Sequence, residues 1–266
     1  NTMFWLRVDA MTEHWTRARV DAEWMEPNAV FVGTSGVEEF SLVFEAGDCP
    51  LDPTLVPVVE IDGHGIEAPR VLSDRSWTVR FRKGEGAWKV VESASDGLRK
   101  RHGLQGPIDD AFMDSFLMVT PSGKAANAKV GEWVSSEMDH ALTQWRQQFR
   151  GDARVKSDLD VSDDDIAAQN LVLWGDPSTN AVLAEIADRL PIKWNGDSIS
   201  VGSKTFSAKD HALAMIFPNP LNPERYVVLN SGFTYREYDY LNNARQTPKL
   251  PDWAIIDVRE PATTQY

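Results

Sequence analysis

The chain has 266 residues, of which 42% are hydrophobic and 25% are charged, a composition typical of a folded protein rather than a disordered one. Because domains usually hold about 100–150 residues, this length predicts two of them. The formal net charge of -13 disfavours nucleic acids and anionic membranes as partners, since both require a basic surface. The single cysteine, Cys49, excludes an internal disulfide, and no apolar run reaches the roughly 18 residues that a membrane span needs.

Hydrophobic residues alternate with polar ones from Phe4 to Val91, which is the period of a strand with one face on a core. Glycine-rich turns separate these runs at residues 33–36, 62–65 and 83–86. About seven short strands with this spacing predict an antiparallel β-sandwich of immunoglobulin-like size over residues 1–95. Most of the ten tryptophans fall on the apolar side of the pattern, which favours core positions over a sugar-stacking platform.

A change of pattern marks the domain boundary. Residues 96–107 contain glycine, proline and the basic cluster 99–102, and they predict a solvated linker. In residues 108–258, buried strands alternate with helices, so we predict a three-layer α/β domain with a mainly parallel sheet, of the flavodoxin or Rossmann type. Residues 259–266 are a predicted tail.

A long helix of the second domain is predicted to follow Asn127, its N-cap, and to end before Gly151. Its apolar side chains recur every three or four residues, as expected for a helix with one face on the core. A shorter helix is predicted after a capping box that runs from Ser162 to Asp165.

Three apolar runs, residues 171–174, 213–217 and 226–229, predict buried parallel strands. Ligands of open α/β sheets bind outside the carboxyl ends of the strands, so polar side chains near these ends are the candidate binding site. They are Asp176, Asn180, Asn219, Asn222, Asn230, Ser231 and Asn243. Such groups suit a neutral polar ligand, a sugar or a peptide backbone. The alternative is that asparagines beside prolines, as in residues 218–223, only hold a turn.

Motifs for nucleophilic catalysis are absent from the sequence. The G-x-S-x-G pattern of α/β-hydrolases does not occur, and the turn at residues 175–177 has no serine, cysteine or threonine at its tip. In that turn, Asp176 is predicted to cap a helix whose first residue is Pro177. The sequence therefore predicts no catalytic residue.

Metal and phosphate sites are not predicted either. The five histidines lie singly, without the spacing that zinc prefers. The acidic run at residues 158–165 resembles a calcium loop, but Asp163 stands where glycine is needed and Gln169 where a bidentate glutamate is needed. A solvated helix start explains this run better, and no phosphate-cradling glycine pattern follows a predicted strand, so no cofactor is expected.

Four segments of the second half are specific enough to suggest a family. They are GPIDDAF at residues 106–112, LWGDP at 173–177 followed by Asn180, FPNPLNP at 217–223 continuing into YVVLNSG at 226–232, and PKLPDWA at 248–254. Together they resemble the C-terminal region of large bacterial prolyl-oligopeptidase-like or esterase-like α/β-hydrolase proteins, over roughly residues 100–258. The resemblance implies an exported parent, secreted or periplasmic, whose serine, aspartate and histidine lie in an upstream catalytic domain outside this chain.

Three functional hypotheses follow. The leading one is that the chain is the non-catalytic C-terminal accessory part of an exported serine hydrolase and partners its catalytic domain. The second is a stand-alone glycan- or peptide-binding module that uses the asparagine side chains or an exposed tryptophan. The third makes the α/β domain a hydrolase in its own right, with Asp176 and His211 as acid and base. The chain begins with Asn1 and enters a predicted strand by Phe4, which suggests a piece of a longer protein.

Overall fold

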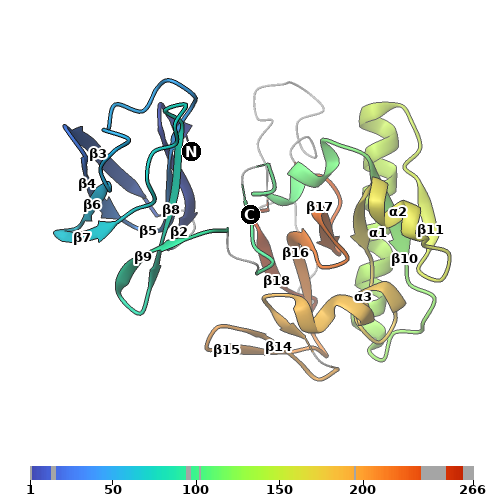
Figure 1. Cartoon of the computed structure of the whole chain (residues 1–266). Helices are drawn as coiled ribbons and strands as arrows, with labels where there is room; N and C mark the ends of the chain where they lie inside the picture. The colour runs from blue at the N-terminus through green and yellow to red at the C-terminus, as the bar shows by residue number, and fades with distance from the viewer. Residues whose placement is uncertain are drawn as a thin grey trace. The chain divides into compact units, whose positions relative to one another are not determined.

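A computed structural model of the chain describes residues 2–12, 16–93, 97–101, 103–194, 196–234 and 250–259. The chain divides into two compact units, Asn1–Gly97 and Leu98–Tyr266 (Figure 1). Sheet accounts for 41% of the structure and helix for 18%, so the fold is predominantly β. Each unit has its own hydrophobic core.

The first sheet of the N-terminal unit buries alternate side chains. In β8, Trp77, Val79 and Phe81 are buried whereas Thr78 is exposed, as the period of two predicts. Neighbouring strands pair antiparallel. Their order is β1 (Thr2–Met3), β2 (Leu6–Met11), β5 (Val37–Phe44), β8 (Trp77–Gly84) and β9 (Ala87–Val91).

The second sheet of this unit shares its core with the first. Its order is β3 (Arg19–Met25), β4 (Ala29–Ser35), β6 (Val58–Ile61) and β7 (His64–Glu67). Among the described residues its pairings are antiparallel apart from β4 with β6, which is parallel. Val30 and Ile61 of this sheet belong to the same cluster as Phe40 and Phe81 of the other. Cys49 is buried in that cluster, and burial raises the pKa of its thiol.

The C-terminal unit is built on a mixed sheet. Its order is β11 (Val155–Ser157), β10 (Phe116–Thr120), β12 (Asn170–Leu173), β17 (Asn222–Leu229), β16 (His211–Asn219) and β18 (Trp253–Asp257). The first four pair parallel, whereas β16 pairs antiparallel with both of its neighbours. The prediction that the strand ending at Phe217 is parallel is therefore wrong. The physical reason is that β16 and β17 are joined by a tight hairpin, which reverses the chain at Pro220.

Two of the described helices, α1 (Ala128–Phe149) and α2 (Asp163–Ala168), begin at their predicted caps. The others are the short 3₁₀ helix η1 (Ile108–Phe112), α3 (Ala181–Ile186) and the 3₁₀ turn η2 (Ala187–Arg189). The side chain of Asn127 accepts a hydrogen bond from the amide of Lys129, and Ser162 and Asp165 form a reciprocal capping box, so both predicted starts are confirmed. None of the described helices combines the length and apolar composition that crossing a membrane requires.

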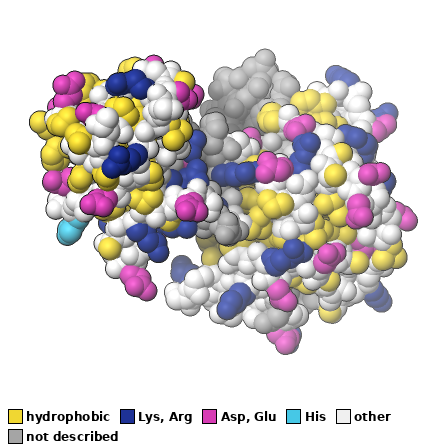
Figure 2. All heavy atoms as spheres, in the orientation of Figure 1, with side chains coloured by type: hydrophobic (Ala, Val, Ile, Leu, Met, Phe, Trp, Pro, Cys, Tyr) yellow, Lys and Arg dark blue, Asp and Glu magenta, His cyan; other side chains and the backbone are white. Residues whose placement is uncertain are grey.

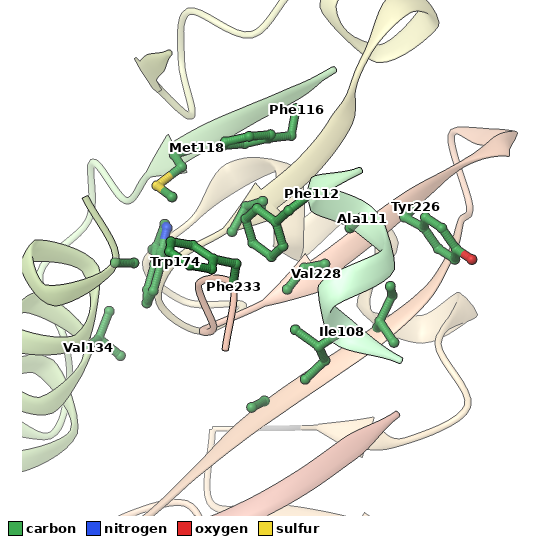
Figure 3. Packing of buried hydrophobic residues seen from close by; sticks show 14 of the residues in the cluster. Ile108, Ala111, Phe112, Phe116, Met118, Val134, Trp174, Tyr226, Val228 and Phe233 are labelled. Atoms are coloured by element: carbon green, nitrogen blue, oxygen red, sulfur yellow. The ribbon is translucent and has the colours of Figure 1, made fainter. Parts of the chain in front are cut away.

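The helices cover opposite faces of the mixed sheet. Val134 of α1 packs in one cluster with Met118 of β10 and Trp174, which follows β12 (Figure 3). Leu183 of α3 packs in another cluster with Leu117, the neighbour of Met118 in β10. Because successive side chains of a strand point to opposite faces, α1 and α3 lie on different sides of the sheet.

Two segments of the C-terminal unit differ from expectation. A small antiparallel sheet of β13 (Lys193–Trp194), β14 (Ser198–Val201) and β15 (Lys204–Ser207) includes a strand, β15, that the sequence did not indicate. The prediction of a solvated basic cluster is wrong for Lys100: its side chain is only 12% exposed, and its Nζ lies 2.7 Å from Oδ1 of Asp252. Arg101 also forms an ion pair, with Glu224.

Candidate functional site

The chain leaves the neighbouring strands β10 and β12 toward opposite faces of the sheet. The helix α1 follows β10 and packs on one face, and α3 follows β12 and packs on the other. Where adjacent parallel strands diverge in this way, a crevice opens outside their carboxyl ends, and ligands of open α/β sheets bind there. This edge of the sheet is the candidate site.

A cavity of about 470 Å³ lies at this edge. Its walls come from the loop after β10, the first half of α1 and the turn after β12. Half of the side chains that line it are apolar, namely Pro121, Ala125, Ala128, Val130, Val134 and Met138. The charged ones are Lys124, Glu132 and Asp176. A cavity of this size and lining suits a ligand with an apolar body and a few polar groups.

Two glycines allow the loops after β10 and β12 to touch. The amide of Gly123 donates to the carbonyl oxygen of Thr179 at 2.8 Å, and a Cβ on Gly123 would lie 2.8 Å from the Cα of Thr179. Gly175 has a φ of 106°, and a Cβ there would overlap Oγ1 of Thr179 in its own turn and lie 3.2 Å from Cβ of Pro121 in the loop after β10. A side chain at either position would separate the two loops, so the wall of the cavity depends on both glycines.

Asp176 lines the cavity, but its carboxylate bonds within its own turn. Its Oδ1 accepts from the amide of Ser178 at 2.7 Å and from the hydroxyl of the same residue at 2.5 Å. The helix that follows begins at Ala181 and is capped by Asn180, so the prediction that Asp176 caps it is wrong. The reason is that the carbonyl of Asp176 accepts from the amides of Thr179 and Asn180, which closes a separate turn before the helix.

Asn180 and Asn230 are buried, and both side chains bond to backbone around the cavity. Oδ1 of Asn180 caps α3 through the amide of Leu183, and its Nδ2 donates to the carbonyl of Trp174 at 3.0 Å. Oδ1 of Asn230 accepts from the amide of Gly175 at 2.7 Å, and its Nδ2 donates to the carbonyl of Gly175 at 2.8 Å. These two predicted site residues therefore hold the loops that form the site.

The structure does not bring Asn219 and Asn222 to this edge. Because β16 runs antiparallel to β17, Asn219 and Asn222 lie at the hairpin, at the amino end of β17. Their side chains accept from the amides of Leu221 and Glu224, as turn asparagines do. Placing them with the other strand ends was wrong for this reason. Ser231 donates to the carbonyl of Gly232, and Asn243 lies outside the described residues.

Asp158, the first residue of the acidic run that was predicted to be solvated, is instead a buried site residue. It is buried after β11, and its Oδ2 accepts from the amide of Ala181 at 2.7 Å and from the hydroxyl of Ser122 at 3.2 Å. Burial alone would raise the pKa of this carboxyl, but these donors outweigh burial and keep its pKa below the usual value. Its charge therefore joins the loop after β10 to the start of α3. The only signal in the sequence was an acidic residue ahead of the capping box.

Asp176 and His211, the acid and base of the third hypothesis, each bond to local partners. Nδ1 of His211 lies 2.7 Å from Oδ1 of Asp210 and 3.0 Å from the carbonyl oxygen of Ser207. The carboxylate of Asp176 bonds to Ser178, as described above. The structure therefore shows no contact between Asp176 and His211 through which a proton could pass.

No protein-family model, no curated protein and no solved structure matches this chain.

The residues that line the cavity indicate which kind of ligand it could hold. Its apolar side chains on α1 can remove an apolar group from water, while Lys124 offers a positive charge, and Glu132 and Asp176 negative ones, to polar parts of the same ligand. This arrangement can therefore accommodate a ligand that has both apolar and polar parts.

Proposed function

We propose that this chain is a peptide-binding module that serves as a non-catalytic accessory part of a serine hydrolase of the peptidase or esterase type. The observation that carries the proposal is the cavity at the diverging ends of β10 and β12, which combines apolar side chains on α1 with polar and charged side chains. The resemblance of residues 106–112, 173–177 and 217–232 to prolyl-oligopeptidase-like proteins supports the hydrolase as partner. It also supports an exported parent and a secreted or periplasmic location.

The ligand chemistry follows from the lining. Apolar side chains form one continuous part of the lining on α1, so burial of a hydrophobic group there would contribute to the binding free energy. Lys124 and Asp176 can pair with a peptide carbonyl and a peptide amide beside that group. A peptide with an apolar side chain combines these features better than a sugar does, because a sugar carries hydroxyls on all sides.

We infer the finer fold on similar grounds. Two sheets with one shared core support an immunoglobulin-like sandwich for the N-terminal unit. Parallel pairing across β11, β10, β12 and β17, with α1 and α3 on opposite faces, supports a three-layer α/β domain of the flavodoxin or Rossmann type. The antiparallel strands β16 and β18 are then additions at one side of that sheet.

Peptide binding can be tested by calorimetric titration of the whole chain with blocked tripeptides that carry leucine, phenylalanine or glycine at the centre. We expect heat of binding with the apolar peptides. Ser135→Trp should abolish it by filling the cavity, because Ser135 lines the cavity from α1. Ser136→Trp is the matched control, since Ser136 is exposed on the same helix and does not line the cavity. Equal loss in both variants, or no binding by any peptide, would reject the proposal.

The accessory role needs a separate measurement. The chain alone should not hydrolyse generic ester or dipeptide substrates. Turnover that a serine-directed inhibitor abolishes would show a nucleophile of its own and overturn the accessory role while leaving the peptide result standing. Binding of a neutral oligosaccharide that is lost on changing Asn219 or Asn230 would instead favour the glycan-binding module.

A further inference from the structure

A second, larger hollow lies on the N-terminal unit and has a different lining. Its volume is about 810 Å³, and it combines aromatic rings with carboxylates. Phe4 and Trp5 line it from the β1–β2 hairpin, and Phe31 lines it from β4. The carboxylates are those of Asp21, Glu23, Glu60 and Asp62, and no lysine or arginine is among the described residues around it. Figure 2 shows hydrophobic side chains at the surface of this unit, interspersed with charged ones.

Phe4 occupies a position that its backbone disfavours. The pairs Thr2 with Arg7 and Met3 with Leu6 leave Phe4 and Trp5 as the two-residue connection of a hairpin. Phe4 has a φ of 52°, a conformation that glycine or asparagine adopts more easily in such turns. Its ring is 88% exposed, so burial in the fold does not compensate for the strain. Strained residues of this kind are concentrated at ligand sites.

Phe31 lies between two glutamates on neighbouring strands. Glu23 of β3 is its cross-strand partner on one side, and Glu60 of β6 is its partner on the other. Directly opposed residues of neighbouring strands share a face of the sheet, so the three side chains lie together. Phe31 is 40% exposed. Within the described part of the chain, neither Glu23 nor Glu60 forms an ion pair, whereas Asp21 pairs with Arg19 at 2.7 Å.

We propose that this surface binds an extended peptide segment that carries arginine or lysine. Exposed aromatic faces attract cations, and the flanking carboxylates of Glu23 and Glu60 supply the opposite charge. Among the described residues no lysine or arginine lines the hollow, and Arg19, which contacts its lining, is paired with Asp21. Charge complementarity therefore favours a basic peptide over a neutral sugar. This site belongs to the N-terminal unit and is independent of the cavity in the C-terminal unit.

The test measures binding of a fluorescein-labelled peptide of alternating arginine and alanine to the whole chain. The same peptide with glutamine in place of arginine, and a neutral oligosaccharide of glucose, are the comparison ligands. We expect the arginine peptide to bind more tightly than both, and its affinity to fall as salt is raised, because exposed charges are screened. Tighter binding of the oligosaccharide, or equal binding of the glutamine peptide, would overturn the proposal.

Two ring variants separate binding from folding. Phe4→Gly relieves the positive φ, so the melting temperature should stay the same or rise, while affinity for the arginine peptide falls about two- to fivefold through loss of one cation–π contact. Phe31→Ala should weaken binding by a similar factor. Leu72→Ala is the matched control, since Leu72 is an exposed apolar residue of the same unit outside the hollow. Unchanged affinity in both ring variants would reject the site.

Charge variants complete the test. Glu23→Gln and Glu60→Gln together should weaken binding and flatten its salt dependence, whereas Glu92→Gln, an exposed glutamate outside the hollow, should change neither. Ser135→Trp, which fills the cavity of the C-terminal unit, should leave arginine-peptide binding intact. If it does not, the peptide binds at that cavity and the inference about the N-terminal unit is wrong.

Discussion

The side chain of Asn230 pairs with the backbone of Gly175 as one peptide group pairs with another. Its Oδ1 accepts from the amide of Gly175 at 2.7 Å, and its Nδ2 donates to the carbonyl of Gly175 at 2.8 Å and to the carbonyl of Leu213 at 3.1 Å. One buried side chain thus joins the ends of β12 and β17 to β16. The turn that forms one wall of the cavity is held by Asn230.

The first prediction concerns Asn230→Ala. The substitution leaves one amide and two carbonyls without their partner in a buried place, so we expect the free energy of unfolding to fall by about 3 kcal/mol. Urea denaturation measures this. Asn127→Ala is the comparison, because Asn127 makes a single cap bond at the start of α1 and should cost only about 1 kcal/mol. Equal costs would mean that Asn230 does not hold the turn.

The second prediction concerns Gly123→Ala. The new Cβ would lie 2.8 Å from Cα and 2.9 Å from the carbonyl oxygen of Thr179, both backbone atoms, so the loops must separate. We expect a loss of about 2 kcal/mol in unfolding free energy and weaker peptide binding at the cavity. Gly151→Ala is the control, because a Cβ there meets nothing within 4 Å and should change stability by less than about 0.5 kcal/mol. Similar stability in both variants would contradict the proposed loop contact.

The fold was predictable where local chemistry decides the structure. The start of α1 followed from a capping residue, Asn127, and a repeating apolar face, and α2 followed from the Ser162–Asp165 box. The direction of β16 was not predictable in the same way. A run of apolar residues is equally compatible with a parallel and an antiparallel strand. The antiparallel direction of β16 follows from the short hairpin at Pro220.

The candidate site was predictable in part, for a related reason. Asp176, Ser178, Thr179 and Asn180 are all residue types that cap helices, and the sequence alone does not say which one does. The structure selects Asn180, because the carbonyl of Asp176 closes a turn first. Gly123 gave no signal, because its contact with Thr179 joins loops that are distant in sequence.

The third prediction uses the acid range. Lys156 lies 2.6 Å from Oδ2 of Asp165, and this contact and the amide and hydroxyl of Ser162 lower the pKa of Asp165 to about 2. The unfolded value is about 4, so the folded state binds the proton more weakly and the ionised carboxylate stabilises the fold. This contribution is complete above about pH 4 and is lost as the pH falls through about 2.

Asp165→Asn should therefore cost about 1 kcal/mol at pH 7 and progressively less between pH 4 and pH 2, measured by urea denaturation across that range. Asp164→Asn is the control, since Asp164 is exposed in the same first turn of α2. A cost that stays constant from pH 7 to pH 2 would show that the charge of Asp165 contributes nothing.

The fourth prediction concerns Tyr226 of β17, a buried residue whose phenol oxygen accepts from the amide of Gly106 at 3.0 Å and donates to the carboxylate of Asp110. Burial, with the neighbouring Asp110, raises the pKa of the phenol, so it remains a donor at neutral pH. Tyr226→Phe removes both bonds and should lower the unfolding free energy by about 2 kcal/mol. In hydrogen exchange, the Gly106 amide should lose protection, while the Leu104 amide, which donates to Arg101, should keep its own.

The difference in unfolding free energy between the original chain and Tyr226→Phe should also depend on pH, and its direction follows from the raised pKa. A raised pKa means that the folded state holds the phenolic proton more tightly than the unfolded state, so the advantage of Tyr226 over phenylalanine is complete below about pH 10 and declines above it. Burial lowers the pKa of Lys100, which also titrates in this range, but both proteins carry it and subtraction removes its effect. A difference that grows above pH 10 would mean that the ionised phenol is the favoured form in the fold, contrary to its bond with Asp110.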